Sequence, residues 1–344
     1  MYPLLTIDLA KLEANMRVIT ERCRSHSLDV FGVTKVARGD PRVGQALVAG
    51  GAVGLADSRL DNLARLREAE LGVPLMLLRT PSLTEVERVI ETADISVNSE
   101  KPVLEALSRT AAARGHVHRV LLMVDLGDLR EGVWGRELFS IFQFASSLPN
   151  IEVWGIGTNL ACLSGASPTP NQYKRLVELL SELAVPNLVV SGGNSSALHL
   201  MRQEMWCGEW TSFVSHLRIG ESAFLGWDII DHTPLWGCYR DVCLLTAEVI
   251  EVQTKPTAKG LRRRAVLAVG RQDIGAGHLQ PVEPGVEVVG VTSDHMVADV
   301  EGAPWATVGG LLSFTPDYDA LLGLFTSPYV EKKHIVNIAV QEIL

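Results

Sequence analysis

Short apolar runs recur along residues 1–225, and stretches in which apolar positions have helical spacing separate them. Continuous runs of Val, Ile and Leu are typical of parallel strands that are buried on both faces. The eight runs end at Lys35, Ser58, Arg79, Ser99, Gly127, Asn159, Asn194 and Ser222. Eight strands that alternate with helices, such as those expected at 59–71 and 171–184, predict a closed (β/α)8 TIM barrel.

The pattern changes after Leu225. Four apolar runs then follow one another through short turns that contain Gly or Pro, with no helix of useful length between them. This arrangement predicts an antiparallel β domain. We therefore expect an α/β chain with a TIM barrel at 1–225 and a C-terminal β domain at 226–344. The apolar segment 2–8 is a candidate strand of the second domain, and the sequence leaves its place open.

The composition is that of a soluble globular protein. Of the 344 residues, 47% are hydrophobic and 21% are charged, which suits a large buried core. No apolar run approaches the length of a membrane span. Asp8 and Lys11 come before the apolar stretch of a secretory signal could form, so we expect no signal peptide. The five cysteines are scattered, which favours reduced thiols in a cytoplasm over a disulfide framework.

The charge balance is acidic, with a formal net charge of −9 at pH 7. An acidic protein favours cationic small molecules over nucleic acid. The one basic cluster, Arg262–Arg264, is interpreted as a solvated turn. No group of His, Cys, Asp or Glu has the spacing of metal ligands, so we expect no metal.

One lysine stands at the end of an apolar strand. Lys35 follows the run 29–34, and active sites of such barrels lie at the carboxyl ends of the strands. The structural alternative is a surface lysine whose stem lies along apolar residues. The functional interpretation is a partly desolvated amine with a lowered pKa, which can form a Schiff base with an aldehyde.

The loops after the seventh and eighth strands have the features of a phosphate site. The first contains Gly192 and Gly193, which let the backbone approach closely, followed by the hydroxyls of Ser195 and Ser196. By itself this segment also suits a plain turn with a helix cap. A lysine at the first strand and a phosphate cradle at the last two would face each other across the barrel mouth, which suits pyridoxal 5′-phosphate.

The segments "VTKV", "VDLGDLREG", "GIGTNL", "GGNSS" and "LRIGE" resemble motifs of the alanine racemase family, the fold type III pyridoxal phosphate enzymes. The expected barrel and β domain resemble that family's architecture. Asn159 stands where alanine racemases usually have histidine. Within the family, the motifs along nearly the whole chain are most similar to those of racemases that act on ornithine.

The resemblance implies roles for individual residues. Arg218 would face the pyridine nitrogen, and Arg130 would bind the cofactor phenolate, the substrate carboxylate or both. The alternatives are a core salt bridge for Arg218 and a loop ion pair with Asp128 or Glu131 for Arg130. The implied cofactor-binding residues are Lys35, Arg130, Asn159, Asn194, Ser195, Arg218, Gly220, Glu221 and Tyr318. Tyr318 would bind the phosphate, and its alternative is a half-buried packing residue.

Racemisation needs a base on each face of the substrate. The resemblance implies that Lys35 serves one face. Alanine racemases place a tyrosine of the partner's β domain on the other, but the corresponding segment 251–270 contains no tyrosine. Candidates for this second base are His295, Asp273 and Cys162, and we favour His295 because imidazole exchanges protons near pH 7. The resemblance also implies a head-to-tail homodimer.

The leading hypothesis is a racemase of a basic amino acid, with ornithine first. Asp57, Asp128, Glu221 and Asp294 are candidates for binding the side-chain ammonium, and the sequence does not choose among them. One alternative is an alanine or broad-spectrum racemase. A second is a non-catalytic pyridoxal phosphate carrier, which has no need of the β domain. A third is a related decarboxylase or aldolase, which usually pairs the pyridine nitrogen with a carboxylate instead of an arginine.

Overall fold

The computed structural model describes residues 2–258 and 260–336. The chain divides into two compact units. The β unit contains the chain up to Leu12, the segment Val36–Arg38 and the chain from Tyr239 onward, and the barrel unit contains Glu13–Lys35 and Gly39–Cys238. The division after Cys238 lies beyond the expected boundary at 225, because residues 226–238 are bonded to the barrel. Arg202 Nε, for example, donates to the buried Asp228 carboxylate at 2.8 Å.

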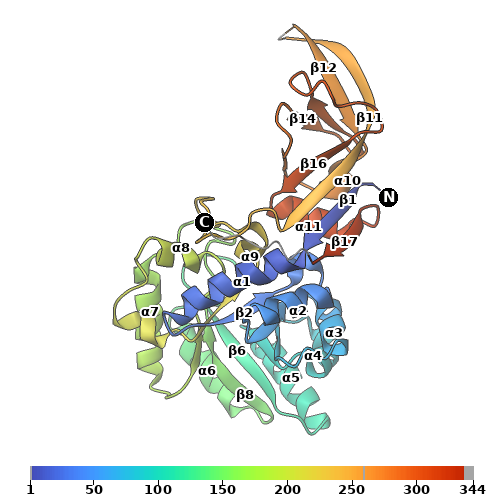
Figure 1. The fold of residues 1–344 in the computed structure, drawn as a ribbon. Coiled ribbons are helices and arrows are strands. Elements are labelled where there is room, and N and C mark those ends of the chain that lie inside the picture. Colours follow the sequence, from blue (N-terminus) through green and yellow to red (C-terminus); the bar gives the residue numbers. More distant parts are fainter. Residues whose placement is uncertain (1, 259, 337–344) are drawn as a thin grey trace. The chain divides into compact units, whose positions relative to one another are not determined.

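In the described part of the barrel unit, eight parallel strands close on one another, and helices surround them (Figure 1). The strands, in the order in which they pair around the barrel, are β2 (Asp29–Val33), β3 (Gly54–Asp57), β4 (Leu75–Leu77), β5 (Ile95–Asn98), β6 (His118–Asp125), β8 (Ile151–Gly157), β9 (Val189–Ser191) and β10 (His216–Ile219). The two-residue strand β7 (Val133–Trp134) pairs with β6 outside this ring. The prediction of a TIM barrel is confirmed.

A helix follows each barrel strand. The helices are α2 (Pro41–Ala49), α3 (Leu60–Glu68), α4 (Val86–Thr92), α5 (Lys101–Ala113), α6 (Glu137–Ser147), α7 (Pro170–Leu183), α8 (Ala197–Arg202) and α9 (Glu221–Leu225), and α1 (Leu9–Arg24) precedes β2. Helix α7 shows why these segments are helical: Pro170 stands at its first turn, and Thr169 and Gln172 form a capping box. Among the described residues, no helix combines the length and apolar character needed to cross a bilayer.

The barrel interior is filled by apolar side chains from most of the strands. Phe31, Met76, Val97 and Leu121 belong to this buried cluster. His216, the first residue of β10, also lies inside: its ring centroid is 4.9 Å from that of Phe31. Burial lowers the pKa of His216 to about 3, so the imidazole is neutral and packs as an aromatic ring.

The β unit is built on one sheet. Its strands are β1 (Leu4–Asp8), β11 (Cys243–Thr257), β12 (Gly260–Leu267), β13 (Leu279–Pro281), β14 (Glu287–Val291), β15 (Met296–Asp299), β16 (Leu311–Pro316) and β17 (Glu331–Ile335). Strand β1 pairs antiparallel with β11 and parallel with β17. The other described pairings in the sheet are antiparallel, as expected. Two helices that the sequence did not predict, α10 (Arg271–Ile274) and α11 (Tyr318–Thr326), also belong to this unit.

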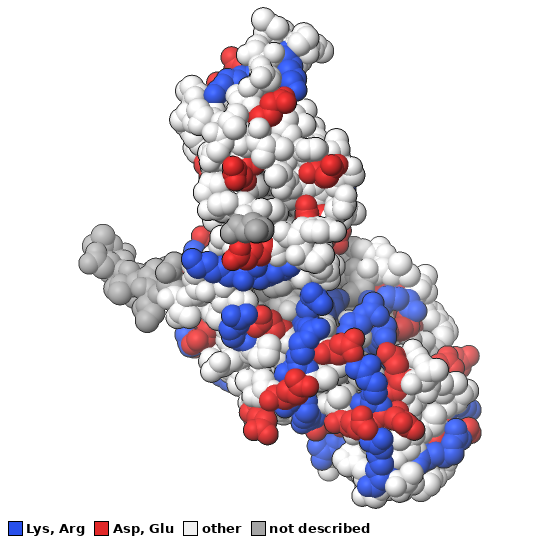
Figure 2. Space-filling view, turned by 90° about the vertical axis from the view of Figure 1, so that its right-hand side faces the viewer, with Lys and Arg blue, Asp and Glu red and all other residues white. Residues whose placement is uncertain are grey.

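Charges of both signs are interleaved on the barrel-unit face drawn in Figure 2. Exposed ion pairs join neighbouring helices of this unit, as Arg88 of α4 pairs with Asp61 of α3 at 2.5 Å. Such exposed pairs contribute little to stability, typically about 0–1 kcal/mol. They keep the outer helices hydrated while the apolar faces pack on the strands.

Candidate active site

Lys35 lies directly beyond β2, at the carboxyl ends of the barrel strands, in a short 3₁₀ turn formed by Lys35–Ala37. Its side chain is half-buried. The preceding residue fixes the turn to the next strand. Thr34 N donates to Ala56 O at 3.0 Å, and Thr34 Oγ1 donates to Asp57 Oδ2 at 2.7 Å.

Asp57 is a buried carboxylate whose oxygens are already bonded. Besides Thr34, it accepts from Arg59 N at 3.0 Å and from Asn62 Nδ2 at 2.9 Å. Burial raises the pKa of Asp57, and these hydrogen bonds oppose that rise. Asp57 therefore orients the turn that carries Lys35, and its oxygens are not directed to a substrate ammonium.

Arg218, in the middle of β10, carries a buried charge. Its guanidinium donates from Nη2 to Thr158 O at 2.8 Å and from Nη1 to Ser191 Oγ. Within the described chain, no carboxylate lies at ion-pair distance from this guanidinium. The core salt bridge that the sequence offered as the alternative for Arg218 is therefore not formed there. Burial lowers the pKa of Arg218 to about 10. A buried guanidinium held only by neutral groups suits a ligand atom that accepts a hydrogen bond.

Arg130 lies in the loop after β6 and is partly exposed. Its Nη2 donates to Glu131 Oε1 at 2.5 Å, and its Nε lies 3.9 Å from Asp128 Oδ2. This is the loop ion pair that the sequence offered as the alternative for Arg130. Asp128 itself is buried and accepts from Leu163 N at 2.9 Å and Ser164 N at 3.1 Å, so it ties the loop after β6 to the loop after β8.

Asn159 and Asn194 extend this network to the loop after β9. Asn194 Nδ2 donates to Asn159 Oδ1 at 3.1 Å, to Leu160 O at 2.9 Å and to Cys162 Sγ at 3.1 Å. Its Oδ1 accepts from Ser196 N at 2.7 Å. Asn159 Nδ2 reaches Asp128 Oδ2 at 3.5 Å. The two asparagines are thus brought together with the Arg130 loop.

Hydroxyls and backbone N–H groups meet where β9 and β10 end. Ser195 Oγ accepts from Gly220 N at 3.4 Å and from Ser222 N at 3.5 Å, both long bonds. The Oγ of Ser222 and the Oγ1 of Thr158 are buried and have no hydrogen-bond partner in the described part of the chain. Donors that are loosely held or unpartnered fit an anionic group with several acceptor oxygens. Gly193, with φ of +106°, makes the turn before Ser195 that only glycine adopts easily.

Four predicted residues, including Asp294, lie in the β unit. His295 is 45% exposed and lies 3.7 Å from Asp294, Tyr318 is half-buried at the start of α11, and Asp273 is buried. Asp273 accepts from Gly270 N at 3.1 Å and from Ser327 Oγ at 2.8 Å. Both of its oxygens therefore stabilise the turn around α10, which makes it a poor proton carrier.

The sequence did not single out Thr34, Asp128 as a loop anchor, or Thr158 for this site. Asp128 had one usable signal, since it lies two residues before Arg130 in a loop rich in charges. Thr34 and Thr158 had none. Their roles depend on strands that are neighbours in the barrel and distant in sequence.

The alanine racemase N-terminal domain profile matches residues 7–226 of the chain. The chain belongs to the alanine racemase family. Two relatives match along almost their whole length. The chain is 37% identical to the ornithine racemase of Acetoanaerobium sticklandii, over 97% of this chain and 99% of the relative. It is 33% identical to the lysine racemase of Thermotoga maritima, over 96% and 98%.

Solved structures show the same fold. The alanine racemase of Corynebacterium glutamicum superposes with a TM-score of 0.75, covering 96% of this chain and 99% of that chain at 20% identity. The cofactor of the alanine racemase family is pyridoxal 5′-phosphate. The residues present fit that group, because the ends of strands β8 and β10 supply the unpartnered hydroxyls of Thr158 and Ser222 for a phosphate, and Arg218 supplies a buried donor without a counter-ion among the described residues.

Proposed function

We propose that this protein is a pyridoxal 5′-phosphate-dependent racemase that interconverts the L and D enantiomers of a basic amino acid, with ornithine as the leading candidate substrate. One observation carries the proposal. Two relatives, at 37% and 33% identity, match over nearly the whole chain, and both are named for basic amino acids. The alternative is an alanine or broad-spectrum racemase. It would use the same barrel residues for the reaction and would differ only in which substrate side chains it accepts.

The chemistry that pyridoxal phosphate would supply when bound is an electron sink that acidifies the Cα–H of the amino acid. Lys35 Nζ removes or returns the Cα proton on one face. Arg130 orients the substrate carboxylate, or the cofactor phenolate, through its guanidinium. Arg218 would donate to the pyridine nitrogen and so keep it unprotonated. Asn159, Asn194, Ser195, Gly220 and Glu221 are proposed to hold the cofactor from the loops after β8, β9 and β10, and Tyr318 to bind its phosphate.

The second face requires another proton carrier. We place His295 in this role, because the side chain is accessible and an imidazole both accepts and donates a proton near neutral pH. The proposed assembly is a homodimer in which this residue serves the partner's site. A cytoplasmic location is proposed because all five cysteine thiols, including the exposed Cys162 and Cys207, are free.

A chiral assay with L-ornithine, L-lysine, L-arginine and L-alanine tests the function. We expect the purified enzyme to be yellow and to racemise at least one basic amino acid faster than L-alanine. Lys35→Ala should lower racemisation at least 1000-fold, because both the anchoring amine and a proton carrier are lost. Borohydride reduction followed by peptide mapping should label Lys35. Retained racemisation in Lys35→Ala, or a label on another lysine, would overturn the assignment.

A mixing experiment tests the homodimer and His295 together. Lys35→Ala and His295→Ala proteins, each inactive alone, should recover up to about a quarter of wild-type activity when their subunits are exchanged, because one site of the mixed dimer keeps both bases. Subunit exchange is verified with differently tagged chains. Activity that stays absent after verified exchange would place both bases on one chain, and an active His295→Ala protein would exclude this histidine.

A further inference from the structure

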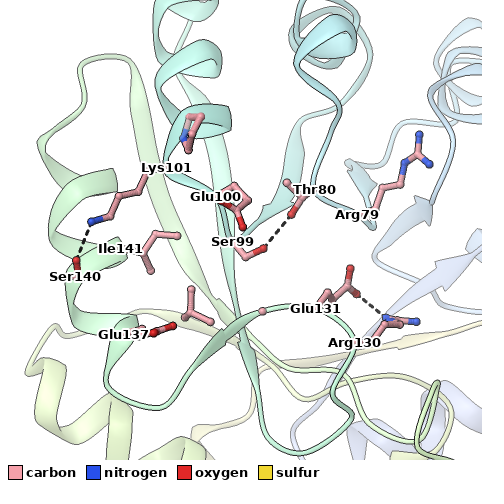
Figure 3. Close-up of a pocket in the computed structure, with 13 residues that line it drawn as sticks. Arg79, Thr80, Ser99, Glu100, Lys101, Arg130, Glu131, Glu137, Ser140 and Ile141 are labelled. Carbon is pink, nitrogen blue, oxygen red and sulfur yellow. Dashed lines mark hydrogen bonds and ion pairs between the residues drawn. The ribbon is translucent and has the colours of Figure 1, made fainter.

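A cavity of about 820 Å³ opens in the barrel unit beside Arg130 (Figure 3). Its wall begins with Thr80, beyond β4, and continues with Ser99 and Glu100, beyond β5. Residues 130–133 and the start of α6 line the rest of it. This volume is within the range of small-molecule sites, about 300–1,000 Å³. Every lining residue belongs to the barrel unit.

Two of the three cations that line this cavity are in ion pairs, and the third donates to a hydroxyl. Arg79 pairs with Glu85, which does not line the cavity, at 3.3 Å. Arg130 pairs with Glu131 at 2.5 Å. Lys101 Nζ donates to Ser140 Oγ at 2.9 Å, as Figure 3 shows.

Two other carboxylates of the cavity are not in ion pairs with the described residues. Glu100, at the start of α5, and Glu137, the first residue of α6, have no cation within 4.0 Å in the part of the chain that the structure describes. Glu137 Oε2 accepts only a long bond of 3.4 Å, from Trp134 N. The cavity therefore holds two carboxylates with unused acceptor capacity, and they come from separate helices.

We propose that this cavity receives the side-chain ammonium of the substrate and that Glu100 and Glu137 bind it; the inference rests on the proposed function. The order of the strands around the barrel explains why the substrate side chain would point toward this cavity. Strands β9, β10 and β2, which carry the phosphate-binding loops and Lys35, are neighbours, and β6 lies on the opposite side of the ring. An amino acid held at Lys35 and by its carboxylate at Arg130 extends its side chain past Arg130, where the cavity begins.

Two of the four acidic residues expected from the sequence, Asp57 and Asp128, are less suited to this role. Both are buried, and their oxygens already accept hydrogen bonds from backbone and side-chain donors, which for Asp128 belong to the loop after β8. Glu100 and Glu137 are solvated until a ligand arrives. An ammonium that reaches these carboxylates gains charge-assisted hydrogen bonds, whereas an uncharged side chain leaves the carboxylates hydrated and gains none.

Discrimination between L-ornithine and L-norvaline tests the inference, since norvaline has the same carbon chain without the side-chain amine. The ratio of their kcat/KM values is measured for wild type, Glu137→Gln, Glu100→Gln and the double variant. Glu182→Gln is the matched control: this exposed carboxylate pairs with Arg136 at 3.0 Å and does not line the cavity. We expect the ratio to fall about tenfold in each single variant and further in the double variant, with kcat/KM for norvaline within twofold of wild type and the control unchanged.

A binding measurement separates this inference from the proposed function. Calorimetry with Lys35→Ala protein, with and without Glu100→Gln and Glu137→Gln, reports ornithine affinity without turnover. The inference would be overturned if the double variant kept both the wild-type ratio of kcat/KM for ornithine over norvaline and an unchanged ornithine affinity. This holds even if wild type racemises ornithine. If no basic amino acid is racemised but ornithine binds through these two carboxylates, the cavity assignment stands and the proposed reaction falls.

Discussion

The buried ionisable residues of the barrel unit differ in whether they keep their charge. Arg218 keeps its charge inside the barrel with two neutral acceptors, an arrangement that favours a ligand as the missing partner. His216 and His118 are buried without charge. Burial lowers the pKa of His118 to about 4 and that of His216 to about 3. In the unfolded chain both histidines return to a pKa near 6.5.

Acid should therefore destabilise the protein through these two histidines. Below about pH 6.5 the unfolded chain binds protons that the folded chain does not, so the free energy of unfolding falls by about 1.4 kcal/mol per pH unit for each histidine until the folded pKa is reached. In His216→Leu, the loss between pH 6.5 and pH 5 should be smaller by about 2 kcal/mol. Urea unfolding at several pH values measures this. An equal loss in both proteins would show that His216 is protonated in the folded state.

The spacing between strands β8 and β9 depends on a close backbone approach at one glycine. Gly155 pairs with Val189, and a Cβ at Gly155 would lie 2.0 Å from Val189 O. The active-site asparagines follow these two strands directly, so their spacing sets the distance that Asn194 spans to Asn159. The sequence predicted both strands but not this close approach. It depends on which strands become neighbours.

Gly155→Ala should accordingly push β8 and β9 apart. We expect the unfolding midpoint in urea to drop by an amount equivalent to about 2–4 kcal/mol, because backbone and not a flexible side chain blocks the added methyl group. Gly290→Ala in β14 is the matched control, since no atom lies within 4 Å of its added Cβ. Its stability should stay the same or rise by up to about 1 kcal/mol. Equal effects of the two substitutions would contradict the crowding at Gly155.

At the scale of the whole molecule, the β unit is assembled from both ends of the sequence. Strand β1 lies between β11 and β17 and is hydrogen-bonded to both. Its register pairs Leu5 with Leu245 and with Lys332. Without β1, the two flanking strands each expose an unpaired edge.

A fragment that begins at Tyr239 should therefore fail to fold cooperatively. The same fragment joined through a flexible linker to residues 1–12 should recover a sigmoidal urea transition and dispersed amide resonances, because the linked strand restores both pairings. A fusion in which residues 1–12 are scrambled is the control. Cooperative folding of the fragment without any added strand would show that β1 is dispensable to the sheet.

The sequence alone was sufficient to predict the eight barrel strands, four of the eight described strands of the β unit and the polar residues that end the barrel strands. These features depend on local periodicity and on the rule that parallel strands place their carboxyl ends on one face of the barrel. It missed α11, whose cap is the Asp317 side chain bonded to Ala320 N, and it left β1 without a sheet.

The tertiary structure was needed to establish which polar groups are already bonded and which are left for a ligand. Asp57 and Arg130 looked alike in the sequence as charged residues near the barrel mouth. Folding buries the first among three donor residues, and it leaves the second at a cavity with two carboxylates that have no cation within 4.0 Å among the described residues. Hydrogen-bond satisfaction depends on neighbours that are distant along the chain, and for that reason no local pattern could have assigned it.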